Sequence, residues 1–125
     1  MKLSPEALQH GLMLFNTAHF FDAHEALEDV WRALPRDQTG RRGLRLHVQG
    51  LVQLAVAFHH QSTGNYVGAR SVLQRALRNL HGADRSFPNL DLNRLRADMA
   101  NWQEHLAGAA PRPKPPQITQ RQPAP

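Results

Sequence analysis

The sequence predicts an all-α protein, a compact bundle of about five helices with a central, apolar third helix. Apolar residues recur at helical spacing along five stretches, and each stretch is bounded by capping residues, prolines or glycines. We find no alternation of apolar and polar residues long enough to predict a strand. A chain of 125 residues also fits one ordinary domain better than two.

The first two helices have clear boundary signals. Ser4 can cap a helix expected from about residue 5 to residue 17, and Pro5 suits its first position. The stretch FFDAHEALEDVW, residues 20 to 31, predicts the second helix. Pro35 must end that helix, because its ring cannot continue one.

The third helix is expected from about residue 41 to residue 62, at the centre of the bundle. A rotation of about 100° per residue places apolar side chains almost all the way round it. These are Leu44, Leu46, Val48, Leu51, Val52, Leu54, Ala55, Val56 and Phe58. The exception is a narrow stripe of Gln49, Gln53 and His60, which must face water or a polar cavity. His59 falls outside this stripe, so we expect it to be buried with a hydrogen-bond partner.

Two more helices complete the predicted bundle. Gly64 ends the third helix and Asn65 caps a fourth, which should end at Gly82. Asp91 starts a fifth helix within LNRLRADMANWQEHLAG. Each of these boundaries uses a residue type that favours helix ends.

Residues 1–107 are thus predicted to form the helical bundle domain, and residues 108–125 a disordered, basic, Pro-rich tail. The final stretch AAPRPKPPQITQRQPAP holds six of the nine prolines and almost no apolar bulk. Such a segment cannot bury enough surface to offset the entropy lost on ordering. Whether its PRPKPP stretch binds an aromatic groove of a partner stays open.

Composition narrows the classes of function. Without cysteine the chain has no disulfide, thiolate ligand or cysteine nucleophile, so any metal would need His, Asp or Glu. No signal peptide and no run of about 20 apolar residues is visible, which predicts a cytoplasmic protein without a membrane span. The net charge is +5, and a basic patch surrounds the loop before the third helix. It comprises Arg32, Arg36, Arg41, Arg42 and Arg45. Solvated helix ends explain such a patch without nucleic acid, and exposed aromatic residues are not interleaved with it.

A candidate polar site joins the second and third helices. His24 lies at the edge of an apolar stripe, Glu28 lies one turn further along the same flank, and Glu25 projects away. With His59, His24 and Glu28 could form a three-ligand site for a divalent metal, leaving one position open as catalytic zinc requires. The same residues could instead form a satisfied polar network that holds no ion, with Trp31 packed beside them.

The two blocks FFDAHEALEDVW and QGLVQLAVAFHHQSTGNYVGA resemble the family known as domain of unknown function 309, which comprises small all-helical prokaryotic proteins. Phe21 precedes a His-Glu-x-x-Glu-x-x-Trp pattern that ends at Trp31, and Gln49 and Gly50 precede His59 by about ten residues. The resemblance covers about residues 10 to 80. It implies a compact helical bundle without an established activity, and it favours a site in which Glu25 also takes part.

A second stretch, GNYVGARSVLQRAL, is similar to the second helix of a tetratricopeptide repeat, although only one copy is visible. We therefore expect a non-catalytic helical module that binds a protein partner or a small ligand, and a homodimer is compatible with this. The alternative is a metal-dependent enzyme, such as a hydrolase with Glu25 as the base. The predicted polar site comprises His24, Glu25, Glu28, Trp31, Gln49, Gln53, His59 and His60.

Overall fold

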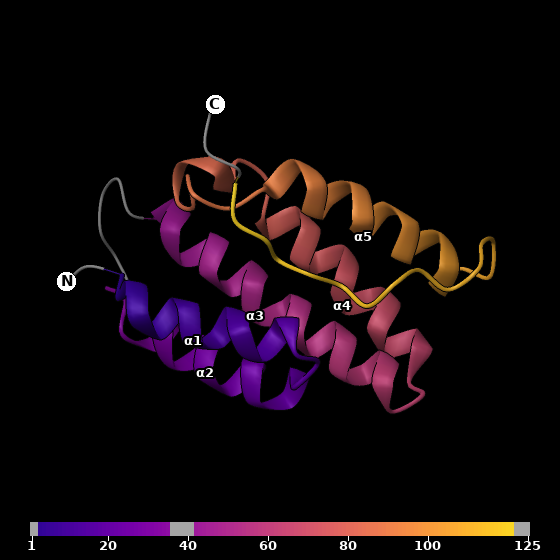
Figure 1. Ribbon diagram of the computed structural model, residues 1–125. Coiled ribbons are helices and arrows are strands. Elements are labelled where there is room, and N and C mark those ends of the chain that lie inside the picture. Colours follow the sequence, from indigo (N-terminus) through magenta and orange to yellow (C-terminus); the bar gives the residue numbers. More distant parts are fainter. Residues whose placement is uncertain (1–2, 36–41, 122–125) are drawn as a thin grey trace.

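The computed structural model describes residues 3–35 and 42–121, and in these residues the chain forms five α-helices and no strand (Figure 1). The predicted all-α bundle is therefore confirmed. The helices are α1 (Pro5–Asn16), α2 (Phe20–Arg32), α3 (Arg42–Ser62), α4 (Tyr66–Asn79) and α5 (Leu92–Leu106), with a short 3-10 helix, η1 (Ala83–Arg85), before α5. No helix in this described part is long and apolar enough to span a membrane.

The helix starts follow the capping residues that the sequence offers. The side chains of Ser4, Asn65 and Asp91 accept backbone hydrogen bonds at the starts of α1, α4 and α5. Two helices end earlier than expected. Helix α2 stops at Arg32, and α4 stops before Gly82, whose φ of +74° leads into the unpredicted η1.

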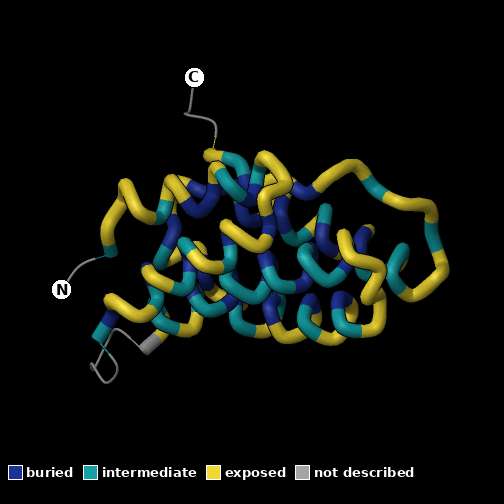
Figure 2. Tube along the Cα trace, turned by 90° about the horizontal axis from the view of Figure 1, so that it is seen from below, coloured by how far each residue is buried: buried dark blue, intermediate teal, exposed yellow. Residues whose placement is uncertain are grey.

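Helix α3 lies at the centre of the bundle, as predicted. Its core side chains Val48, Leu51, Leu54 and Ala55 are inaccessible to solvent. Helix α2 packs along one side of α3 and α4 along the other, and α1 packs against α2. Figure 2 shows the buried positions, in dark blue, gathered towards the inside of the bundle and the exposed positions, in yellow, towards its outside.

Four aromatic rings pack together in the core and connect the loop between α1 and α2 with helix α5. The ring of Phe58 on α3 contacts Phe15 and Phe20 near the first loop, with centroids 5.9 and 5.7 Å away. On its other side, Phe58 meets Trp102 of α5 edge to face at 5.0 Å. This contact ties α5 to the rest of the core.

Glycine at position 50 sets the spacing between α3 and α4. A Cβ atom there would lie 2.8 Å from the Leu80 side chain and 3.2 Å from the carbonyl oxygen of Ala76. A backbone atom of the neighbouring helix cannot move aside easily. The close approach of α3 and α4 therefore depends on Gly50.

Part of the C-terminal segment differs from the predicted tail. Residues 108–115 are mostly exposed, whereas residues 116–121 lie against the bundle, and Ile118 is only 3% exposed. Polar groups of α1 and of the loop before α5 bond to this segment, which the low apolar content of the stretch did not predict. The domain boundary at residue 108 stays a prediction, and residues 122–125 lie outside the described part.

Candidate functional site

One face of α2 carries four residues of the pattern that the sequence singles out. Phe21, His24, Glu28 and Trp31 follow each other at steps of three and four residues, which places them along one line on the helix. All four are at least partly exposed, and Phe21 is the most open at 51%. Tyr66 on α4 is exposed to a similar degree, at 54%, so what distinguishes Phe21 is its place in this row.

An ion-pair row runs along the middle of this face. The Nε2 atom of His24 lies 2.9 Å from Oε2 of Glu28, and the other carboxylate oxygen pairs with Arg32. Both oxygens of Glu28 are therefore engaged by side chains of its own helix. Such i, i+4 pairs are local and need no other element to form.

Helix α3 contributes the two ends of the site. At one end, the ring of His59 lies 5.4 Å from the ring of Phe21, centroid to centroid. At the other end, the Arg45 guanidinium lies 4.2 Å from the centroid of the Trp31 ring and donates to the carbonyl of Leu34 at 2.9 Å. We call the residues Phe21, His24, Glu28, Trp31, Arg45 and His59 the α2–α3 strip.

Phe21, near the start of α2, contacts His59 near the end of α3, and Trp31, near the end of α2, contacts Arg45 near the start of α3. Helices α2 and α3 are therefore antiparallel. Gln49, Val52 and Val56 continue the line from Arg45 to His59 at steps of three and four residues. All three are partly exposed, as expected for residues on the side of α3 that borders α2 at the protein surface. Gln49 thus lies beside the α2–α3 strip but is not part of it.

Two of the three predicted metal ligands, His24 and Glu28, are in contact, but His59 does not join them. No three His, Asp or Glu side chains in residues 3–35 and 42–121 are grouped so that they could hold a metal ion. The ring of Phe21 contacts both His24 and His59, whereas no hydrogen bond or ion pair joins His59 to Glu28 in the described part. The prediction that His59 is buried is wrong, because it faces the half-open Phe21 and remains partly exposed.

The other predicted site residues lie apart from the strip. Glu25 is exposed and no helix covers it, as the helical wheel indicates. Gln53 accepts a hydrogen bond from Asn79 of α4 at 2.8 Å. His60 lies 3.4 Å from the side-chain amide of Asn65. Gln53 and His60 therefore serve the contact between α3 and α4.

The basic patch is described only in part. Arg36, Arg41 and the side chain of Arg42 lie outside the described part of the structure. Arg32 pairs with Glu28, and Arg45 packs on Trp31. Both described arginine side chains thus have partners within the chain.

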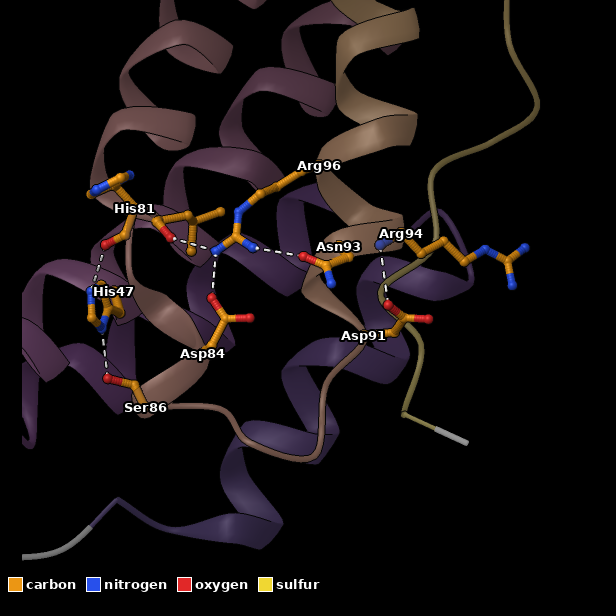
Figure 3. Close-up of polar contacts among 9 residues, drawn as sticks. His47, His81, Asp84, Ser86, Asp91, Asn93, Arg94 and Arg96 are labelled. Carbon is orange, nitrogen blue, oxygen red and sulfur yellow. Dashed lines mark hydrogen bonds and ion pairs between the residues drawn. The ribbon is translucent and has the colours of Figure 1, made fainter. Parts of the chain in front are cut away.

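A second polar cluster was not foreseen. The Nδ1 atom of His47 lies 2.6 Å from Oγ of Ser86, and its Nε2 lies 3.1 Å from the carbonyl oxygen of His81 (Figure 3). A carbonyl only accepts, so Nε2 carries the proton and neutral Nδ1 accepts from the hydroxyl. Desolvation by burial lowers the pKa of His47 below its ordinary value. The cluster ties α3 to the connection between α4 and α5.

Arg96 of α5 reinforces the same connection. It donates to Oδ1 of Asp84 at 2.8 Å and to the carbonyl of Leu80 at 3.3 Å (Figure 3). The hydrogen bond from Arg96 lowers the pKa of Asp84. Sequence reasoning missed both ties, because their members lie 12 to 39 residues apart.

Fold and site together define a small all-helical domain with a polar and aromatic strip on one helix pair. The model of the family described as domain of unknown function (DUF309) matches residues 8–72, and the chain belongs to this family. The match confirms the resemblance found in the sequence. It includes both helices that build the α2–α3 strip, whereas α5 lies beyond it.

Two curated relatives are similar to most of this chain. An uncharacterized protein of Aquifex aeolicus (strain VF5) is 26% identical over 113 residues, which cover 90% of this chain and 31% of that protein. The uncharacterized protein YpuF of Bacillus subtilis (strain 168) is 31% identical over 90 residues, which cover 71% of this chain and 49% of YpuF. The matched residues thus cover 31% and 49% of the length of these two relatives.

Proposed function

We propose that the chain is a protein-binding module whose recognition surface is the α2–α3 strip. The observation that carries this proposal is the placement of Phe21. Its side chain is 51% exposed and lies between the imidazole rings of His24 and His59. Aromatic and arginine side chains contribute most of the binding energy in protein interfaces, and the strip adds Trp31 and Arg45 beyond them.

The strip's charged groups support binding better than chemistry. Glu28 is engaged by His24 and Arg32, so it is neither a free base nor a free ligand. Arg45 is held by the Trp31 ring and by the carbonyl of Leu34. Side chains that are fixed before binding lose less entropy in a complex.

The charge around the strip indicates the chemistry of the partner. Helix α2 carries four acids, Asp22, Glu25, Glu28 and Asp29, against one arginine. Three of these acids are exposed. At the Phe21 end of α2, a partner surface with an apolar side chain and basic residues beside it would complement these acids, whereas Arg45 places a positive charge at the other end of the strip.

A display selection tests this proposal without knowledge of the natural partner. Peptides would be selected on the wild-type chain and then measured on Phe21→Ala. We expect selected sequences that combine a basic and an apolar residue, and a loss of affinity of at least about tenfold on Phe21→Ala.

The matched control is Met13→Ala, because Met13 of α1 is 49% exposed and lies outside the strip. Binding to this variant should stay within about twofold. Binders that keep their affinity for Phe21→Ala would contradict the proposal. A stoichiometric metal in tag-free protein would favour the enzyme alternative instead.

A further inference from the structure

We propose that the cleft between α1 and the loop before α5 is a binding site for an extended peptide, and that residues 116–121 of the chain occupy it as a displaceable ligand. This site lies apart from the α2–α3 strip and does not rest on the function proposed for it. In Figure 1 the segment, drawn in yellow, returns from the end of α5 towards its start. Hydrogen bonds at both walls of the cleft hold it there.

Asn16, the last residue of α1, recognises the backbone of the segment. Its side-chain Nδ2 donates to the carbonyl of Ile118 at 2.9 Å, and its Oδ1 accepts from the N–H of Ile118 at 2.7 Å. One amide thus satisfies both backbone groups of one residue, as a neighbouring strand would. These two bonds do not depend on the type of side chain at position 118, which suits a site that binds the backbone of an extended peptide.

The opposite wall is the loop before α5, and it also bonds to backbone. The N–H of Asp91 donates to the carbonyl of Thr119 at 2.9 Å, and the N–H of Arg121 donates to the carbonyl of Asn89 at 2.7 Å. Between them, Leu90 and Gln120 form an isolated antiparallel bridge. Extended peptides are captured by sheet edges in this manner.

Two side chains anchor the segment and define the ligand class. Ile118 is 3% exposed and joins the hydrophobic core, and Pro116 is buried. Their neighbours Gln117, Gln120 and Arg121 are exposed. The cleft therefore fits an extended peptide with an aliphatic residue two positions after a proline, and the side chain between them, Gln117, adds a hydrogen bond of 2.9 Å to the carbonyl oxygen of Asn16.

The way the segment is connected makes it displaceable. Residues 111–115 contain three prolines, and four of these five residues are exposed. The short link supplies a high effective concentration, so a few hydrogen bonds and two anchoring side chains suffice in cis. A competing peptide needs the same contacts and no change in the helices.

A fluorescence anisotropy experiment with the synthetic peptide PPQITQR, residues 115–121, tests the site in trans. The full chain with Ile118→Asp should leave the cleft open, because a carboxylate cannot enter the core position. We expect saturable binding of the peptide to this variant, and binding at least about tenfold weaker to the wild type, whose cleft is filled. A second change, Asn16→Ala, should weaken the binding to Ile118→Asp by about tenfold or more.

Two controls make the result decisive. A peptide with Asp in place of the isoleucine should not bind, and circular dichroism should show that the Ile118→Asp chain keeps its helices. The proposal fails if the folded Ile118→Asp chain does not bind the peptide, or if the wild type binds it equally well.

Hydrogen exchange on the wild-type chain gives a test that does not require this variant to fold. The amide of Ile118 should be protected, yet it should exchange through local opening, faster than Leu54 at the centre of α3. Asn16→Ala should speed exchange at Ile118 and leave Leu54 unchanged. Equal protection at both amides would make the segment a fixed part of the core, and an unprotected Ile118 would show that the cleft is empty.

Discussion

Two histidine clusters of this molecule differ in how their members are brought together. His24 pairs with Glu28 one turn away on the same helix. His47 bonds to Ser86 and His81, which lie 39 and 34 residues further along the chain. The first cluster forms whenever α2 is helical, whereas the second exists only when α3 and the α4–α5 connection are in place.

This difference separates recognition from stability. The His24 row lies on an open face, where an ion pair contributes little to the stability of the fold, so its residues are available for binding a partner. The His47 cluster bonds α3 to the connection between α4 and α5, across 34 to 39 residues of sequence, which suits a structural tie. The motif with the clearest pattern in the sequence is therefore expected to matter least for folding.

The largest expected effect is the replacement of His47. His47→Ala should lower the free energy of unfolding by about 1–3 kcal/mol, because it removes two hydrogen bonds and leaves their partners in a half-buried site. His24→Ala should cost no more than about 0.5 kcal/mol, as is usual for an i, i+4 pair on a helix surface. Urea denaturation measures the loss in free energy of unfolding for both variants. Equal losses would contradict the claim that only the His47 cluster stabilises the fold substantially.

Acidification should destabilise the fold through the His47 cluster. The pKa of His47 is lowered by desolvation and by the nearby Arg96, while its bond to the His81 carbonyl and Asp84 act in the opposite direction. The unfolded chain then binds a proton at higher pH than the folded chain does. Stability is therefore lost as the pH falls below about 6.5 towards the folded-state pKa.

His47→Gln is the matched variant for this prediction, since it keeps hydrogen-bonding groups but does not titrate. Thermal unfolding from pH 8 to pH 5 should show a smaller loss of stability for His47→Gln than for the wild type. An NMR titration of the wild type should place the His47 midpoint below that of an ordinary histidine. Identical pH profiles for the two proteins would remove His47 from the acid response.

The fold could be predicted because its signals are local. Ser4, Asn65 and Asp91 mark helix starts within a few residues of the turn they cap. The apolar circumference of α3 required its central position. Within the strip, the line from His24 to Trp31 on α2 was equally visible, because helical periodicity fixes it.

The missing parts depend on contacts between distant segments. Nothing in the sequence near Asn16 indicates that its amide bonds to Ile118, 102 residues later. The helical wheel placed His59 near apolar neighbours on α3, but it could not show that the facing residue on α2 would be the half-open Phe21. Which residues of two helices face each other is decided by how the helices pack, and this could not be predicted from the sequence of either helix alone.

The smallest expected effect concerns the site as the sequence first suggested it. If His24, Glu28 and His59 formed one unit, replacing Glu28 and His59 together would cost clearly less than the sum of the single changes. In the structure the two are not bonded, and the ring of Phe21 lies against His59. Glu28→Ala and His59→Ala should therefore be additive to within about 0.3 kcal/mol.

A second double-mutant cycle supplies the positive control for this measurement. His47→Ala and Ser86→Ala remove the two ends of one 2.6 Å hydrogen bond, so their coupling should exceed about 0.5 kcal/mol. Chemical denaturation of both sets under the same conditions compares the two clusters directly. Coupling between Glu28 and His59 as large as in the control cycle would mean that the strip closes into one polar unit in solution. That outcome would support the hypothesis of a metal site with His24, Glu28 and His59 as ligands, because a metal could then bridge Glu28 and His59, which are not bonded in the structure.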